Sequence, residues 1–198
     1  MMNHIIDCKG LNCPLPVVNT KKYFDTIENG VATIIVDNEI AKNNVVKFAE
    51  NANLEVNVSE KDNLYHITIT KGEGESQQLK IENNFEANEK FTIVVSSDKL
   101  GDGDEALGEA LMKSYLFALS EADIIPNNLV FLNSGVKLVV EDSLVLESID
   151  KLKERGVSIY SCGLCLDFYK IKDKVQVGEI TNMYAIIEMM NSSKTIKL

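Results

Sequence analysis

The chain has 198 residues, of which 45% are hydrophobic and 25% are charged, so it can bury one large core or two small ones. Its formal net charge of −10 and its lack of tryptophan offer no basic surface for phosphate groups, so we do not expect nucleic-acid binding. No signal-peptide pattern opens the chain, and no stretch approaches the roughly 20 apolar residues of a membrane helix. We therefore expect a cytoplasmic protein without membrane association, whose four cysteines stay reduced.

Residues 1–71 are predicted to form a first domain in which strands and helices alternate. A strand at 4–7 precedes a helix from Pro14 to Asn29, which Gly30 is expected to close as a C′ residue. The remaining elements are a strand at 31–36, a helix at 40–52 and two strands at 54–59 and 64–70, joined by a turn at 60–63. The predicted order is βαβαββ.

Residues 72–90 lose this periodicity and carry glycine, acidic and amide residues, which is typical of a solvated linker. Residues 91–198 then form a second predicted domain. Strands alternate with helices in it, which predicts a three-layer αβα domain with a mainly parallel sheet. Strands are expected at 91–96, 129–132, 157–160 and 195–198, and the longer helices at 105–122, 144–155 and 181–190.

The helix at 105–122 has two sequence signals. Asp104 is a good N-cap residue for its start. Apolar residues at helical spacing predict the face that it buries. This face consists of Leu107, Leu111, Tyr115, Leu116 and Leu119.

Cys13 stands directly before Pro14, Leu15 and Pro16, at the start of the first predicted helix. Both prolines suit a first helical turn, where a missing N–H costs little. Cys13 is therefore expected at the N-cap, where free N–H groups and the helix dipole lower the pKa of a thiol. A thiolate there can attack a persulfide, hold its terminal sulfur and pass it on. Plain capping of the helix is the alternative.

Cys162 and Cys165 directly follow the predicted strand at 157–160. This places them at the carboxyl edge of a parallel sheet, where open α/β domains bind their ligands. Cys162 is expected to attack, because the outer cysteine of a Cys-x-x-Cys motif usually has the lower pKa. Cys165 would resolve the mixed disulfide or accept the sulfur next. Ser161 and Gly163 indicate a tight and exposed approach, and the alternative is two small core residues at a turn.

Cys8 ends the first predicted strand, and burial there is expected to make it structural. A resolving disulfide with Cys13 stays open, because a spacing of five residues does not decide it. The four cysteines do not have the spacing of zinc knuckles, so no metal site is expected. The two histidines, His4 and His66, are not expected to act as catalysts or ligands.

The sequence around these cysteines resembles known families. Residues 4–71, with Cys13-Pro14-Leu15-Pro16 after Asp7-Cys8-Lys9-Gly10-Leu11, resemble the TusA/SirA sulfur-carrier domain. This resemblance implies a two-layer βαβαββ sandwich whose CPxP cysteine, here Cys13, carries persulfide sulfur between proteins. Residues 91–198 resemble the DsrE-like sulfur-relay domain. The domain order with Cys162-Gly163-Leu164-Cys165 resembles the YedF family, which is associated with selenium metabolism.

The segment from Gly178 to Tyr184 also resembles part of that family, and we expect it near the Cys162 loop. Thr181 or Asn182 would there hydrogen-bond a thiolate or its sulfur adduct. The alternative is that Thr181 is an ordinary N-cap of the last helix.

Together these features predict a two-domain relay that carries sulfur or selenium as a transient cysteine persulfide or selenopersulfide, without a resident cofactor. The resemblance implies relay partners such as a cysteine desulfurase, and assembly into homo-oligomers. Whether the chain turns over as a sulfurtransferase or is only loaded by other enzymes stays open. Two alternatives are a thiol-disulfide oxidoreductase that uses Cys162 and Cys165, and a non-catalytic regulatory adaptor.

Overall fold

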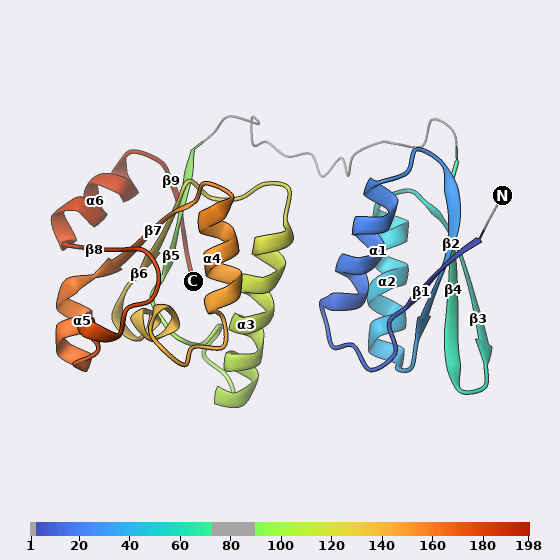
Figure 1. Cartoon of the computed structure of the whole chain (residues 1–198), viewed down its shortest axis with the longest axis horizontal. Helices are drawn as coiled ribbons and strands as arrows, with labels where there is room; N and C mark the ends of the chain where they lie inside the picture. The colour runs from blue at the N-terminus through green and yellow to red at the C-terminus, as the bar shows by residue number, and fades with distance from the viewer. Residues whose placement is uncertain (1–2, 73–89) are drawn as a thin grey trace. The chain divides into compact units, whose positions relative to one another are not determined.

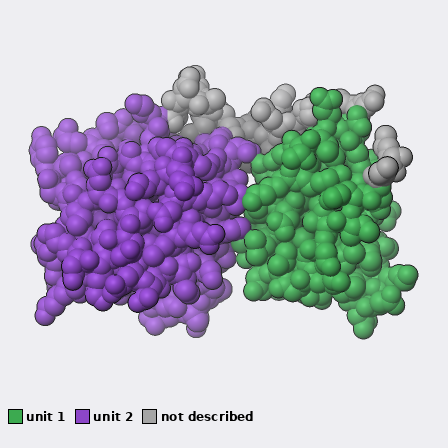
Figure 2. All heavy atoms as spheres, viewed as in Figure 1, with its two compact units in different colours: residues 1–84 green, residues 85–198 purple. Residues whose placement is uncertain are grey.

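The computed structural model describes residues 3–72 and 90–198. The chain divides into two compact units, residues 1–84 and residues 85–198 (Figure 2). Each unit has its own sheet (Figure 1). Of the predicted linker at 72–90, all but the two end residues lies outside the described residues.

Unit 1 is a two-layer sandwich in which α1 and α2 cover one face of a four-stranded sheet (Figure 1). The strand order is β1-β2-β4-β3, with β1 parallel to β2 and the other pairs antiparallel. This confirms the predicted βαβαββ order. The elements are β1 (Asn3–Asp7), α1 (Leu15–Asp25), β2 (Gly30–Val36), α2 (Glu39–Asn51), β3 (Glu55–Lys61) and β4 (Leu64–Lys71).

The core of unit 1 lies between the helices and the sheet. Ile34, Ile67 and Ile69 of the sheet are fully buried against Val45 and Ala49 of α2. The register of α2 is fixed at its start by Asn38, whose side chain accepts the Ala41 N–H at 2.8 Å. The same contact therefore determines which side chains of α2 point away from the core.

The predicted end of the first helix is wrong. Helix α1 stops at Asp25, and Gly30 is the first residue of β2, where it pairs with Lys71. The Lys71 ammonium group donates to the backbone oxygens of Phe24, at 2.9 Å, and Ile27, at 2.7 Å. Carbonyl groups at a helix end lack partners within the helix, so this lysine supplies what the predicted glycine cap would have supplied.

The hairpin between β3 and β4 is tighter than predicted. Both strands extend to the pair Lys61 and Leu64, which leaves the two-residue turn Asp62-Asn63. The φ angles of these two residues are 55° and 60°, respectively. Two successive left-handed residues match the right-handed twist of the strands.

Unit 2 is a three-layer domain with a five-stranded sheet in the order β8-β7-β6-β5-β9, and all its strand pairs are parallel. Helices α3 and α4 cover one face, and α6 covers the other (Figure 1). These layers confirm the predicted fold class. The elements are β5 (Phe91–Val95), α3 (Glu105–Glu121), β6 (Asn128–Phe131), the 3₁₀ helix η1 (Asn133–Val139), α4 (Leu146–Glu154), β7 (Ser158–Cys162), α5 (Gly163–Tyr169), the 3₁₀ helix η2 (Lys172–Lys174), β8 (Glu179–Thr181), α6 (Met183–Asn191) and β9 (Lys194–Lys197).

The start of α3 is as predicted, because the Asp104 side chain accepts the Leu107 N–H at 2.9 Å. The predicted buried face is wrong in part. Leu107 and Leu111 are 57% and 43% exposed. The loop before the helix folds back so closely that a Cβ at Gly108 would lie 3.1 Å from the Lys99 Cβ. This contact sets the rotation of α3, whose buried stripe consists of Gly108, Met112, Leu116 and Ser120.

Candidate functional site

The Cys13 thiol is exposed at the loop that leads into α1. Its nearest polar partner comes from α2, where the Asn44 amide nitrogen donates to the Cys13 sulfur at 3.6 Å. Asn44 lies between the buried Ala41 and Val45, so packing of α2 onto the core holds its side chain at this place. The site therefore combines an accessible thiol with one neutral donor.

The expectation that Cys13 caps α1 is wrong. The N-cap residue is Pro14, which makes no side-chain capping bond, and the helix begins at Leu15. The Leu15 N–H is already bonded to the Asn12 carbonyl at 3.0 Å, and Pro16, in the first turn, has no N–H. The first turn thus has fewer free donors than the sequence suggests, and the donor at the Cys13 sulfur comes from α2 instead.

Cys8 is fully buried in the core of unit 1 and is a free thiol. The Asn19 amide approaches its sulfur at 4.0 Å. Burial raises the pKa of Cys8, and the Asn19 hydrogen bond opposes this only in part. These features favour the structural role expected for Cys8 over a resolving role.

Cys162 and Cys165 lie at the carboxyl edge of the parallel sheet, as expected. Cys162 is the last residue of β7 and the N-cap residue of α5, and Cys165 follows on the first turn of that helix. Both are free thiols. Cys162 is only 1% exposed and packs with Val94, Val130 and Ile186 under α6. The expected exposed approach to Cys162 is therefore wrong in this structure, because α6 covers that face of the strand.

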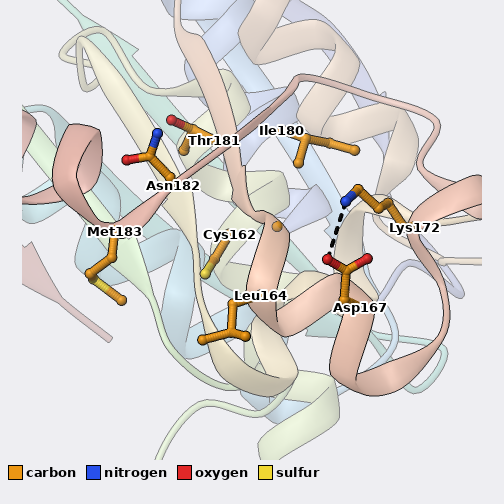
Figure 3. A pocket seen from close by; sticks show the side chains of 9 residues that line it. Cys162, Leu164, Asp167, Lys172, Ile180, Thr181, Asn182 and Met183 are labelled. Atoms are coloured by element: carbon orange, nitrogen blue, oxygen red, sulfur yellow. Dashed lines mark hydrogen bonds and ion pairs between the residues drawn. The ribbon is translucent and has the colours of Figure 1, made fainter.

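An open pocket of about 560 Å³ nevertheless lies beside Cys162, and Figure 3 shows the Cys162 sulfur directed toward Leu164 and Met183. Leu164 and Met183 are 76% and 48% exposed, and exposed apolar side chains that gather beside a pocket are typical of ligand-binding grooves. Asp167 and Lys172 form an ion pair of 3.1 Å at the rim of this pocket. The lining is formed by Cys162, Gly163, Leu164, Asp167, Lys172, Ile180, Thr181, Asn182 and Met183.

Cys165 is partly exposed and contacts a different element. The backbone N–H of Asn133, the first residue of η1, donates to the Cys165 sulfur at 3.2 Å. Burial raises the pKa of Cys165, as does the neighbouring Cys162 thiol, while the Asn133 N–H lowers it. The pKa is raised overall.

The Gly178–Tyr184 segment lies beside Cys162, where we expected it, but its details differ. Thr181 belongs to the short strand β8 and pairs with Cys162, so it is not the helix N-cap. Asn182 is the N-cap of α6, and its side-chain oxygen accepts the Ala185 N–H at 3.1 Å. Gly163 is close to this strand, because a Cβ there would lie 3.4 Å from the Thr181 carbonyl oxygen. A hydrogen bond from Thr181 or Asn182 to a thiolate stays a prediction.

The sequence does not indicate the donors at the two accessible thiols, which are Asn44 at Cys13 and Asn133 at Cys165. Asn44 is 31 residues from Cys13, and Asn133 is 32 residues from Cys165. One signal was available for Asn133, since it follows a buried strand at the edge where ligands bind.

Neither a metal cluster nor a membrane-spanning helix is found in the described part of the chain. Among residues 3–72 and 90–198, no group of three or more His, Cys, Asp and Glu side chains could hold a metal ion. No helix in these same two ranges is long and apolar enough to cross a membrane.

Comparison with protein families covers both units. The model of the family described as Sulfurtransferase TusA matches residues 4–71, which include Cys8 and Cys13. The model of the DsrE/DsrF-like family matches residues 89–198, more than half of the chain. The chain belongs to the DsrE/DsrF-like family. Its architecture, a TusA domain followed by a DsrE-like domain, confirms the predicted pairing, and both families are related to sulfur relay.

Solved structures resemble each domain separately. For the TusA domain, a SirA-like protein from Desulfitobacterium hafniense is 37% identical over 36% of this chain and 100% of its own, with a TM-score of 0.35. For the DsrE-like domain, the YchN protein from Escherichia coli is 16% identical over 56% of this chain and 99% of its own, with a TM-score of 0.44. A protein of unknown function from Methanobacterium thermoautotrophicum is 14% identical over 56% of this chain and 100% of its own, with a TM-score of 0.43. No curated protein matches the chain.

Proposed function

We propose that this protein carries sulfur as a persulfide on Cys13 and exchanges it through the Cys162–Cys165 pair. The observation that carries the proposal is the exposed Cys13 thiol, with the Asn44 amide 3.6 Å from its sulfur, inside residues that match the Sulfurtransferase TusA model. An accessible thiol with a donor at its sulfur is suited to nucleophilic sulfur chemistry.

Loading of Cys13 needs no oxidant. The Cys13 thiolate attacks the outer sulfur of a donor persulfide, the donor's S–S bond breaks, and the donor leaves as a thiolate. A cysteine desulfurase that bears a persulfide is a donor of this class. A relay partner with a free thiolate then takes the outer sulfur from Cys13 by the same exchange.

The second cysteine pair supports exchange and release. One thiol of the pair takes the outer sulfur, and the other can then attack the sulfur that remains bonded to the protein. This second attack expels hydrosulfide and leaves a Cys162–Cys165 disulfide, so the released sulfur is reduced at the expense of two thiols. Proximity supports this step, since the Cys162 thiol is close enough to raise the pKa of Cys165.

Selenium can use the same thiols, because a selenopersulfide forms and transfers by the same displacement. The resemblance to a family associated with selenium metabolism supports this extension. We also propose a reducing, cytoplasmic location, where the four cysteines remain free, and assembly into homo-oligomers.

The test is site-resolved mass spectrometry of the full chain after incubation with a cysteine desulfurase and cysteine. Each sulfur adds about 32 Da. We expect this gain on Cys13 and, after relay, a transient gain on the Cys162–Cys165 pair, followed by a loss of about 2 Da there as the disulfide forms. The Cys13→Ser variant should lose both gains, whereas Cys8→Ala, at the buried thiol, should keep them. Selenocysteine in place of cysteine, with the same donor enzyme, tests the selenium extension. An unmodified Cys13 under conditions that load the donor enzyme would contradict the proposal.

A second function, thiol-disulfide exchange, is favoured by the same closeness of Cys162 and Cys165. In that case oxidation removes about 2 Da across the pair, and Cys13 gains nothing from the donor. A regulatory adaptor without sulfur chemistry would retain its biological effect when Cys13 and Cys162 are both replaced by serine.

A further inference from the structure

We propose that the backbone N–H of Asn133 makes Cys165 the sulfur-bearing thiol of the DsrE-like domain, and that Tyr169 positions this N–H. The proposal rests on the persulfide exchange proposed above and assigns the roles within the cysteine pair. Cys165 bears the sulfur, and Cys162 resolves it.

The first observation is the backbone of Asn133. Its N–H donates to the Cys165 sulfur at 3.2 Å. Its φ angle is 46°, in the left-handed region that few residues other than glycine and asparagine adopt. Residues held in this region concentrate at functional sites, because the surrounding structure must stabilise them.

The turn that contains Asn133 is tightly fixed against β5. The Leu132 N–H donates to the Val95 carbonyl at 2.9 Å, and the Gly135 N–H donates to the Leu132 carbonyl at 2.9 Å. A Cβ at Gly135 would lie 2.3 Å from the Val95 oxygen, so only glycine allows this approach. The direction of the Asn133 N–H is therefore set before any sulfur is bound.

Side chains hold the turn from the other side. The Tyr169 hydroxyl donates to the Asn133 side-chain oxygen at 3.1 Å. The Lys137 ammonium lies 5.1 Å from the centre of the Tyr169 ring and 3.2 Å from the Asp98 carboxylate. Burial acts to raise the pKa of Asp98, but hydrogen bonds with Ser134 and Lys137 outweigh it, and the pKa is lowered. This chain of contacts joins the carboxyl ends of β5, β6 and β7.

The chemistry that this donor can assist is departure of the Cys165 thiolate. When an acceptor thiolate attacks the outer sulfur of a Cys165 persulfide, the S–S bond breaks and its electron pair stays on the Cys165 sulfur. A prepositioned N–H stabilises the negative charge at that atom, and a stabilised thiolate leaves faster. Cys162 is 1% exposed, while Cys165 is partly exposed, so an acceptor reaches Cys165 more readily.

The test compares Asn133→Gly with Asn133→Val in the full chain. Both variants lose the side-chain oxygen that Tyr169 contacts, but only valine resists the left-handed backbone. The readout is the pH profile of Cys165 alkylation, resolved by mass spectrometry. We expect Asn133→Val to react about tenfold more slowly at pH 8, with its midpoint at higher pH, and Asn133→Gly to stay within about threefold of the unaltered protein.

Tyr169→Phe removes only the hydroxyl contact, and we expect it to slow Cys165 alkylation about threefold, while Tyr184→Phe, at an exposed tyrosine of α6, leaves it unchanged. If Asn133→Val does not fold, the comparison of Tyr169→Phe with Tyr184→Phe tests the inference instead. Cys13 serves as an internal control and should keep its profile in every variant.

The inference would be overturned if Asn133→Gly and Asn133→Val had the same alkylation profile of Cys165. If the valine variant does not fold, the same profile in Tyr169→Phe and Tyr184→Phe would overturn it. So would loading of Cys162 alone in the unaltered protein. Failure to load Cys13 counts against the proposed function instead, and the alkylation profiles of Cys165 do not depend on it.

Discussion

The Asn44 side chain donates to the Cys13 sulfur at 3.6 Å across 31 residues of sequence. Asn44 is anchored by the core face of α2, and Cys13 lies in the loop before α1, so the contact depends on how the two helices pack. An uncharged amide donates to a sulfur anion without forming an ion pair with it. This suits the role proposed for Cys13, which requires the thiol both to take up sulfur and to release it.

Replacing Asn44 by aspartate should slow alkylation of Cys13. A carboxylate beside the sulfur disfavours the thiolate, and we expect the rate with iodoacetamide at pH 7.5 to fall about threefold to tenfold. The matched control is Asn43→Asp, which adds the same charge at the preceding, exposed position of α2. Equal rates in the two variants would show that Asn44 does not act on the Cys13 sulfur.

Replacing Gly135 by alanine should destabilise the DsrE-like domain. The new Cβ would lie 2.3 Å from the Val95 carbonyl oxygen, which is backbone and cannot turn aside. We expect a loss of about 2–3 kcal/mol in the free energy of unfolding, measured by urea denaturation. Gly103→Ala is the control, because nothing lies within 4 Å of its Cβ position. A loss in the control as large as at Gly135 would refute the steric explanation.

Cys8 should make the TusA domain less stable at high pH. Burial raises the pKa of Cys8 in the folded protein, so the folded state holds this proton more tightly than the unfolded chain does. The stability that this gives is complete below the ordinary thiol pKa and is lost as the pH rises through the raised value. Urea unfolding between pH 7 and pH 10.5 should show a steeper decline than in Cys8→Ala. Parallel curves would exclude Cys8 as the source.

Lys71→Met should loosen the end of α1. The lysine donates to the carbonyls of Phe24 and Ile27, and hydrogen bonds of a charged donor contribute about 1.5–3 kcal/mol. We expect faster hydrogen–deuterium exchange in residues 20–28, while Lys47→Met, at an exposed position of α2, leaves this exchange unchanged. Unaltered exchange in Lys71→Met would show that the helix end is held by other contacts.

The local patterns of the chain predicted the βαβαββ element order of unit 1 and the three layers of unit 2. They did not predict the short strand β8. Errors arose where a distant residue decides the outcome. The sequence predicts Gly30 as a helix cap, but the Lys71 ammonium group already donates to the carbonyl oxygens at the end of α1. The sequence predicts Leu107 and Leu111 as core residues. The close packing at Gly108 instead turns the Gly108 side of α3 inward, which leaves both leucines exposed.

The cysteines themselves are visible in the sequence, and their surroundings are not. The burial of Cys162 depends on α6, a helix that begins 21 positions later in the chain. The donor at Cys165 is a backbone N–H, which carries no sequence signature beyond the tolerance of asparagine for a left-handed turn.

Cys162 cannot swing outward with its loop, because it is a strand residue whose backbone pairs with Thr181. Its sulfur is directed toward the side chains of Leu164 and Met183, which also line the pocket. Exposed side chains of this kind change rotamer within picoseconds to nanoseconds. Rotation of these two side chains would therefore change access to this thiol faster than a loop opening could, and size selection there would respond to their bulk.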